Sequence, residues 1–374
     1  PNSRYAPGAH QMMALSYYKL DDVQLAAPHI FEYLEASSYL DIANERVVMI
    51  LDAIEEYAAS PKLPDDRLMA LSLQALYHSK AYDRTTRSFD VAKSRECIVK
   101  LGEELDKAAY APYTMQAAYA YASLMSRAGK TLDDTLVLVD RCIPMCAGNP
   151  LEVKFYRLKL MVVANSKELD ELLALYNSCP EPVKTLPDVA ASVANRLVMN
   201  DEYAKALEIA ERALAATPGD QGLTRVTNMC SLVGKPAPEI AGTEFASGNA
   251  IKLSDYRGKV VLIDFWATWC GPCIGELPNV LAAYKKYHDL GFEIFGVSLD
   301  QPNKAEQFGA FLKDKGMPWP QIYEGLYWNV PSRKDYKFDG IPFMVLVDRK
   351  GIIRLVNKRG EALDPAVESL VNEK

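Results

Sequence analysis

The sequence predicts a protein of two domains, an all-α domain followed by an α/β domain with a mixed sheet. At 374 residues, the chain is long for a single domain. From about residue 10 to 232 apolar residues recur at helical spacing, whereas beyond residue 233 strand-like and helix-like segments alternate. We therefore expect domains over 1–232 and 233–374.

The composition excludes several classes of partner. Hydrophobic residues make up 49% of the chain and charged residues 24%, which suits packed cores. The net charge of −7 argues against nucleic acid or an anionic membrane surface as the main partner. No apolar run reaches the roughly 18 residues of a membrane-spanning helix. The chain begins at Pro1 without an initiator Met, as expected after loss of an export signal or lipid anchor.

The N-terminal domain shows the helical pattern throughout. One example is the apolar series Val47, Ile50, Leu51, Ile54 and Tyr57, which places one face of a helix in a core. Helix breakers recur between such segments, namely Pro61, Pro64, Gly129, Gly148–Pro150, Pro180, Pro182 and Pro218–Gly219. We expect about ten helices here, and no strands.

One segment of this domain resembles a tetratricopeptide repeat. The stretch 201–218 has small residues at Ala206 and Ala213, where paired helices approach closely, and Pro218 follows the helix. A degenerate second copy is expected around 117–129. The pattern favours a degenerate α-solenoid, and an irregular helical bundle is the alternative.

The C-terminal domain begins at the rigid segment 234–238, with Pro236 and Pro238. Residues 250–253 form one arm of an expected hairpin, turned at 247–249. Strands are expected at 259–265, 292–298, 343–348 and 352–357, and helices at about 271–288, 303–315 and 364–372. Strands joined through helices, followed by a closing hairpin, predict a mixed sheet with helices on both faces.

Two cysteines separated by two residues, Cys270 and Cys273, stand where the expected apolar strand 259–265 is followed by a helix. The unpaired N–H groups and positive end of a helix N-terminus stabilise a thiolate. Pro272 suits the first helical turn, where its missing N–H costs nothing. We expect Cys270 at the exposed lip and Cys273 one turn inward, so that the first attacks a disulfide and the second resolves the mixed disulfide.

A zinc site is the alternative use of such a cysteine pair. Zinc needs two further ligands, but the sequence has no second CxxC, and its four histidines (His10, His29, His78, His288) are scattered. We therefore expect no metal. The other five cysteines (Cys97, Cys142, Cys146, Cys179, Cys230) are expected to be buried small hydrophobes. Whether Cys142 and Cys146 pair is left open, because Pro144 stands between them.

The residues around the pair resemble a known superfamily. The stretch 261–273 resembles the active-site segment of thioredoxins almost residue for residue. Glu276-Leu277-Pro278 and the upstream segment 253–259 are similar to the TlpA/ResA branch, whose members are extracytoplasmic thiol–disulfide oxidoreductases. The resemblance covers about residues 233–374. It implies a thioredoxin fold with a cis-proline facing the cysteines, which is Pro342 here.

The resemblance also implies roles for the residues near the pair. Asp264 would accept the proton of Cys273, and Glu276 would assist or tune that transfer. Trp269 would shield the sulfur of Cys270. The expected substrate contacts are Trp269, Gly271, Pro272 and Ile341, beside the catalytic Pro342.

Three positions depart from the family pattern. Phe343 replaces the Thr that usually follows the proline, and Ile274 replaces a basic residue that is common after the second cysteine. Asp264 is the residue that thioredoxins have, where the TlpA/ResA branch often carries a neutral residue. These changes leave the chemistry intact and leave the identity of the substrate open. A cluster of Trp319, Tyr323, Tyr327 and Trp328 is expected to wall the active-site groove, although core packing explains each of them alone.

The sequence therefore predicts a thiol–disulfide oxidoreductase, with the helical domain docking its partners. The Gly271-Pro272 dipeptide is that of thioredoxin and favours a reductase over an oxidase. The expected cofactor is none beyond the Cys270–Cys273 disulfide. Expected partners are a protein disulfide and a thiol electron donor, for which a membrane thiol–disulfide carrier is one candidate. Nucleic acid is not expected, and the oligomeric state is left open.

The resemblance also indicates where the protein is found. The resemblance implies an extracytoplasmic, periplasmic or lipid-anchored bacterial protein, and a cytoplasmic location is the alternative that the free cysteines favour.

A peroxiredoxin is a rival enzyme class with a related fold. A peroxiredoxin needs Thr or Ser three residues before its reactive Cys and Pro seven residues before it. Cys270 has Ala267 and Ile263 at these positions, so the motif does not match. A helical scaffold with a redox-regulatory domain remains the alternative from another class.

Overall fold

The computed structural model describes residues 6–19, 22–59, 64–108, 114–166 and 168–373. The chain folds into two compact units, residues 1–183 and 184–374. Among the residues described, no helix is both long enough and apolar enough to cross a membrane.

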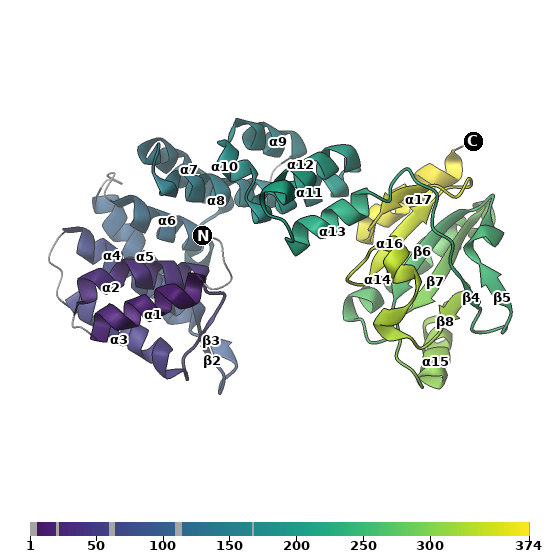
Figure 1. Cartoon of the computed structure of the whole chain (residues 1–374), viewed down its shortest axis with the longest axis horizontal. Coiled ribbons are helices and arrows are strands. Elements are labelled where there is room, and N and C mark those ends of the chain that lie inside the picture. The colour runs from purple at the N-terminus through teal and green to yellow at the C-terminus, as the bar shows by residue number, and fades with distance from the viewer. Residues whose placement is uncertain (1–5, 20–21, 60–63, 109–113, 167, 374) are drawn as a thin grey trace. The chain divides into compact units, whose positions relative to one another are not determined.

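The first unit is built mainly from helices, shown in purple to teal in Figure 1. Its helices are α1 (Ala6–Lys19), α2 (Val23–Ala36), α3 (Glu45–Ala59), α4 (Pro64–Lys80), α5 (Val91–Lys107), α6 (Met115–Leu124), α7 (Leu132–Cys142), α8 (Pro150–Ser166) and α9 (Leu169–Ser178). The apolar faces of α1 to α8 form one core, which includes the predicted series Val47, Ile50 and Ile54. The helical pattern of this region is confirmed.

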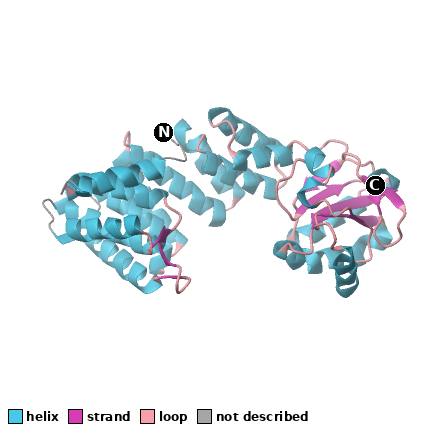
Figure 2. Ribbon diagram, turned by 60° about the horizontal axis from the view of Figure 1, so that its bottom comes forward, coloured by secondary structure: helices cyan, strands magenta, loops and turns pink. Residues whose placement is uncertain are grey.

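A small sheet interrupts this helical unit, which corrects the expectation of helices throughout. It contains β1 (Leu40–Asp41), β2 (Ala81–Asp83) and β3 (Ser88–Phe89), in the order β1-β2-β3. Figure 2 shows strands in magenta within this helical unit. Strands of two or three residues leave no alternation long enough to recognise in a sequence.

The second unit begins with helices as well. The short α10 (Glu181–Lys184) spans the boundary at residues 183/184, and α11 (Pro187–Met199), α12 (Tyr203–Ala216) and α13 (Gln221–Cys230) follow it. Helix α12 packs against both α11 and α13, and buries Ala206, Ala210 and Ala213. The small residues lie where the sequence pattern expects close helix contacts, and the tetratricopeptide interpretation stays a prediction.

These helices contact the sheet of the same unit directly. The Val356 N–H donates to the Tyr203 hydroxyl at 3.2 Å. The Lys358 ammonium donates to the Met199 carbonyl at 2.9 Å and pairs with Asp201 at 2.6 Å. The compact unit therefore starts well before residue 233. The division at 232/233, where the sequence pattern changes from helices to alternating strands and helices, stays a prediction.

The sheet has the strand order β10-β9-β6-β7-β8. Its strands are β6 (Val260–Trp266), β7 (Phe292–Ser298), β8 (Gln321–Tyr323), β9 (Phe343–Val347) and β10 (Ile353–Val356). Strands β6, β7 and β8 run parallel, while β9 is antiparallel to both β6 and β10. A separate hairpin joins β4 (Ala241–Thr243) to β5 (Ala250–Lys252). The predicted mixed sheet is confirmed.

Four helices accompany this sheet: α14 (Gly271–Tyr287), α15 (Ala305–Lys315), α16 (Ser332–Tyr336) and α17 (Leu363–Asn372). Three of them match predicted helices within two residues at each end. The short elements β8 and α16 lie in the segment between α15 and β9, for which the sequence pattern predicts no element.

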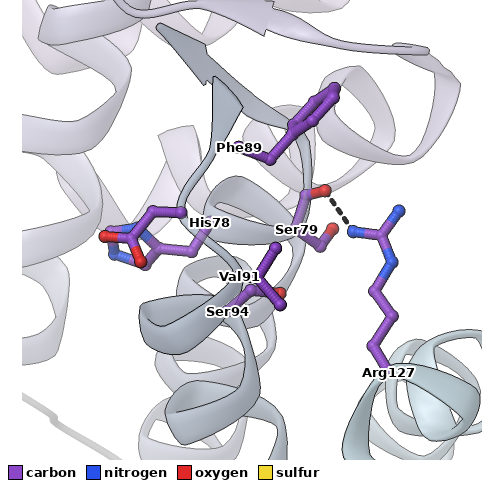
Figure 3. Close-up of a pocket in the computed structure, with 7 residues that line it drawn as sticks. His78, Ser79, Phe89, Val91, Ser94 and Arg127 are labelled. Atoms are coloured by element: carbon purple, nitrogen blue, oxygen red, sulfur yellow. Dashed lines mark hydrogen bonds between the residues drawn. The ribbon is translucent and has the colours of Figure 1, made fainter. Parts of the chain in front are cut away.

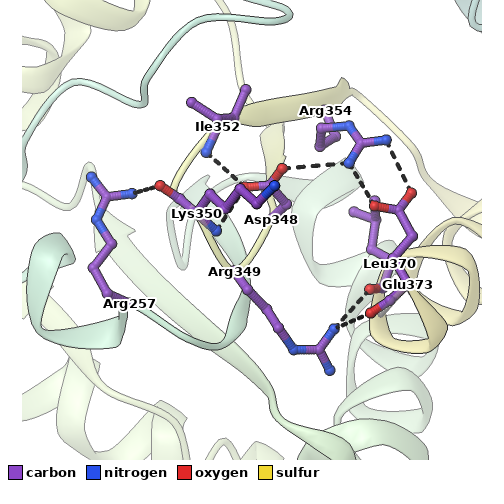
Figure 4. A network of polar contacts seen from close by, with 8 residues as sticks. All are labelled: Arg257, Asp348, Arg349, Lys350, Ile352, Arg354, Leu370 and Glu373. Carbon is purple, nitrogen blue, oxygen red and sulfur yellow. Dashed lines mark hydrogen bonds and ion pairs between the residues drawn. The ribbon is translucent and has the colours of Figure 1, made fainter.

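A polar network fixes the β9–β10 hairpin to the C-terminal helix (Figure 4). The Asp348 carboxylate closes the turn by accepting from the Lys350 and Ile352 N–H groups, each at 2.9 Å. Arg349 donates to the carbonyl of Leu370 at 3.1 Å, near the end of α17. A cation near helix-terminal carbonyls is favourable, so this arginine helps hold α17 in place.

Gly296 in β7 provides a stability test of this sheet. A Cβ there would lie 2.0 Å from the Gln321 Oε1, which accepts the indole N–H of Trp266 at 3.0 Å. Gly296→Ala should therefore lower the free energy of unfolding by roughly 1–3 kcal/mol, the usual cost of overpacking, as measured by urea denaturation. Gly275→Ala is the control: a Cβ added there would have no atom within 4 Å, and the substitution should not destabilise α14. Equal stability of both variants would contradict the packing described.

Candidate functional site

The two cysteines of the CxxC motif form a disulfide. The Cys270 and Cys273 sulfurs are bonded at 1.99 Å, with their Cα atoms 5.2 Å apart. Cys270 is the N-cap of α14, and its sulfur accepts the Cys273 N–H at 3.2 Å. Pro272 lies in the first turn of that helix, as expected. A sulfur at this position sits where unpaired N–H groups and the helix dipole favour negative charge.

The exposure of the pair differs from expectation. Both cysteines are buried, with exposed fractions of 5% for Cys270 and 4% for Cys273. The prediction that Cys270 is exposed at the start of the helix is therefore wrong. The neighbouring residues Trp269, Gly271 and Pro272 are exposed instead. A reacting disulfide must approach between these neighbours.

Asp264 is a buried carboxyl in the middle of the central strand. It pairs with Gly296 on one side and Met344 on the other, and is 3% exposed. Its Oδ1 has no hydrogen-bond partner among the residues described. Burial, with a smaller effect from the Glu276 carboxylate, raises the pKa of Asp264 to about 7. A carboxyl with such a pKa exchanges a proton near neutral pH.

Glu276 lies on α14, one turn after Cys273, and is half-buried. Its Oε1 accepts the Gly360 N–H at 2.5 Å and the Asn279 amide at 3.2 Å. These bonds tie the loop after β10 to the active-site helix. The same carboxylate raises the pKa of Asp264, so the two acidic residues interact.

The proline opposite the motif has the predicted cis bond. The Ile341–Pro342 peptide is cis, and strand β9 begins directly after it. Phe343 pairs with Phe265 across β6 and β9. Since β6 leads into the loop that carries Cys270, this register brings Pro342 and the cysteine pair to the same edge of the sheet.

The predicted aromatic cluster divides into two groups. The Trp269 ring lies 5.4 Å from that of Tyr327 and 6.1 Å from that of Trp328, measured between centroids. Trp319 is instead buried beside Tyr284. Tyr323 packs against Phe308 and Phe245. Of the four predicted residues, Tyr327 and Trp328 therefore extend the aromatic surface around Trp269, which is 45% exposed.

Asp300 is a site residue that the sequence interpretation missed. It is 1% exposed, and its carboxylate accepts the Thr268 N–H at 3.1 Å and the Ser298 hydroxyl at 2.8 Å. Its backbone carbonyl accepts the Tyr327 N–H at 3.2 Å. Asp300 thus anchors the loop before Cys270 to the aromatic segment. Its position just beyond β7, whose carboxyl end lies beside that of β6, was the available signal.

The remaining cysteines lie apart from this site. Cys97, Cys142, Cys146, Cys179 and Cys230 are all buried, and Cys142 and Cys146 do not form a disulfide with each other. Among the described residues, no group of three His, Cys, Asp or Glu side chains is arranged to hold a metal ion.

The raised pKa of Asp264 gives a pH-dependent test. The folded oxidised protein keeps this proton up to about pH 7, whereas an unfolded Asp loses it near pH ~4. The free energy of unfolding therefore carries a contribution that falls as pH rises from about 4 to 7. Asp264→Asn, which does not titrate, should increase stability at pH 8 by up to roughly 4 kcal/mol and change it little at pH 4.

The measurement is urea denaturation of wild type and variant across this pH range. Asp314→Asn, whose side chain is 70% exposed, is the matched control. If the difference in free energy of unfolding between wild type and Asp264→Asn does not change with pH, Asp264 has an ordinary pKa.

Comparison with known proteins places this site in a family. A model of the AhpC/TSA family matches residues 233–356. Thiol-disulfide oxidoreductase ResA of Geobacillus kaustophilus is 31% identical over 129 residues, covering 33% of this chain and 68% of the relative. ResA of Oceanobacillus iheyensis is 42% identical over 144 residues, covering 38% of this chain and 72% of the relative.

Among solved structures, the thioredoxin domain of a thiol–disulfide oxidoreductase from Bacteroides vulgatus is 34% identical. The match covers 37% of this chain and 98% of that domain, with a TM-score of 0.35. The matched family segment, 233–356, includes both cysteines and Pro342. By its identity to the two ResA proteins over more than two thirds of their length, the chain belongs to the ResA family of thiol–disulfide oxidoreductases.

Proposed function

We propose that the protein reduces disulfides of other proteins through Cys270 and Cys273, and that its helical unit docks those proteins. The observation that carries the proposal is the arrangement at one end of α14. A disulfide stands at the helix N-terminus, a buried carboxyl with a pKa of about 7 lies on the adjoining strand, and a cis-proline lies at the same sheet edge.

The first step starts from the reduced pair. Cys270, as a thiolate stabilised by the N-terminus of α14, attacks one sulfur of the substrate disulfide. A bond forms between that sulfur and Cys270, the substrate disulfide breaks, and the other substrate sulfur leaves as a thiolate. Trp269, Gly271 and Pro272 flank the reacting sulfur, and with Ile341 and Pro342 they form the proposed substrate contacts.

The second step releases the substrate. Cys273 passes its proton to Asp264 and attacks the Cys270 sulfur. The Cys270–Cys273 bond forms, and the second substrate sulfur leaves as a thiolate, so two electrons have moved from the cysteine pair to the substrate. Glu276 tunes this transfer because its charge helps raise the pKa of Asp264.

Several parts of the proposal rest on the resemblance of the sequence. The Gly271-Pro272 dipeptide favours reduction over oxidation. A thiol electron donor must restore the dithiol after each cycle, and a membrane thiol–disulfide carrier is one candidate. The same resemblance supports a location outside the bacterial cytoplasm, either periplasmic or lipid-anchored, and a cytoplasmic location is the alternative.

Docking is supported by an apolar pocket of about 290 Å³ in the helical unit. Figure 3 shows Phe89 and Val91 at this pocket, together with Arg127, which donates to the Ser79 carbonyl. Phe89 and Val91 are 45% and 69% exposed. Exposed apolar side chains beside a pocket are typical of surfaces that bind other proteins. The alternative function, a helical scaffold regulated by its redox domain, also uses such a surface but needs no turnover.

The roles of the two cysteines can be separated by substitution. Cys270→Ser should abolish reduction of a small disulfide such as hydroxyethyl disulfide, because the attacking sulfur is lost. Cys273→Ser should still react once and accumulate mixed disulfides, because nothing resolves them. Mass spectrometry of the trapped adducts measures this and identifies the bound protein. Adducts on Cys273 in the Cys270→Ser variant, formed as fast as those on Cys270, would contradict the assignment of roles.

The docking surface can be tested in the full chain. Phe89→Ser combined with Val91→Ser should lower the rate with the trapped natural partner relative to the rate with hydroxyethyl disulfide. The expected decrease of that ratio is about tenfold, the effect of losing roughly 1.4 kcal/mol of apolar contact. Val48→Ser, at an exposed position on α3, is the control and should leave the ratio unchanged. An unchanged ratio in the double variant would favour a structural role for this surface.

A further inference from the structure

A second pocket adjoins the active-site edge of the sheet. It has a volume of about 230 Å³ and is lined by the segment 337–343, which contains the cis Ile341–Pro342 bond. Helix α13 supplies one wall through Arg225 and Met229. The segment after β10 supplies another through Asn357 and Arg359.

The walls of this pocket are held together by specific bonds. Arg225 forms a two-pronged ion pair with Asp339, with Nε–Oδ1 at 2.8 Å and Nη2–Oδ2 at 3.0 Å. The Asn357 amide donates to the Met229 sulfur at 3.1 Å, and its carbonyl accepts the Met344 N–H at 3.2 Å. Helix α13 is therefore fixed against the cis-proline segment. It also lies before residue 233, outside the segment that matches the family.

The charges at this pocket do not cancel. Asp339 is paired with Arg225, so their charges offset each other. Lys337 and Arg359 are both exposed and line the same pocket, and neither forms an ion pair with any residue that the structure describes. Two unpaired cations gather here, although the whole chain carries a net charge of −7. A negatively charged group is the complementary ligand.

The position of the pocket indicates where such a group would come from. Phe343 pairs with Phe265, which places Pro342 at the sheet edge that also carries Cys270. A polypeptide whose cysteine reacts with Cys270 must come close to this edge. Pro342 belongs both to this edge and to the lining of the pocket, and a volume of about 230 Å³ suits a single side chain.

We propose that this pocket is a specificity subsite for an acidic side chain of the substrate polypeptide, near the cysteine that reacts with Cys270. Lys337 and Arg359 supply the attraction, and the Arg225–Asp339 pair holds the wall formed by α13. The inference rests on the proposed function and adds a substrate class to it.

The test uses two synthetic peptides, each containing one disulfide, that differ only by Glu or Gln beside the reactive cysteine. Reduced full-length protein is mixed with each peptide, and the second-order rate of its oxidation is measured. Wild type should prefer the Glu peptide by about fivefold at low salt, as expected for two exposed charge contacts, and high salt should weaken the preference.

Two double variants complete the test. Lys337→Gln with Arg359→Gln should bring the ratio of the two rates to about one, because the attraction is lost. Lys304→Gln with Lys313→Gln makes the same change of net charge at exposed positions outside the pocket, and should keep the wild-type ratio. A wild-type ratio near one, or a preference that survives loss of Lys337 and Arg359, would overturn the subsite. Failure of reduced wild type to react with either peptide would instead overturn the proposed function.

Discussion

The position of strand β6 between β7 and β9 is the constraint on which the active site depends. All seven residues of β6 are buried, and its pairing with both neighbours fixes what lies at its carboxyl end. That end leads into Cys270 and α14, the start of β9 brings Pro342 beside it, and the end of β7 brings Asp300. The site is therefore assembled by register: a slip of one residue in either pairing would turn the side chains of a strand to its opposite face.

The sequence was sufficient for those parts of the fold that have long or distinctive patterns. The strand before Cys270, the helix after it and the cis bond at Pro342 were all predicted. Strands of two or three residues, such as β8, have too few residues to show a period. Asp300 acts through a hydrogen bond to Thr268, 32 positions away in the sequence. Arg225 acts through an ion pair with Asp339, 114 positions away. Contacts of this kind exist only once the chain has folded.

The buried carboxyl of Asp264 is unfavourable for stability but useful for the proposed reaction. A carboxyl enclosed in an apolar strand is hard to ionise, and the Oδ1, which has no partner among the residues described, adds to that difficulty. An apolar residue would suit the core of the sheet better. The same burial gives the carboxyl a pKa near neutrality, which is what proton exchange with a thiol requires. Proteins commonly tolerate such unfavourable groups where they serve a reaction.

The cysteines outside the active site place a different constraint on the fold, because a protein that exchanges disulfides can also react with its own thiols. Burial raises the pKa of Cys142 to about 12 and that of Cys230 to about 11, and raises the pKa of Cys97 and Cys146 as well. Each increase of one unit in the pKa of a thiol lowers the fraction present as reactive thiolate about tenfold. Burial in the cores of the two units thereby lowers the tendency of these four thiols to exchange with the active-site disulfide, which favours a chain that keeps its correct disulfide bond.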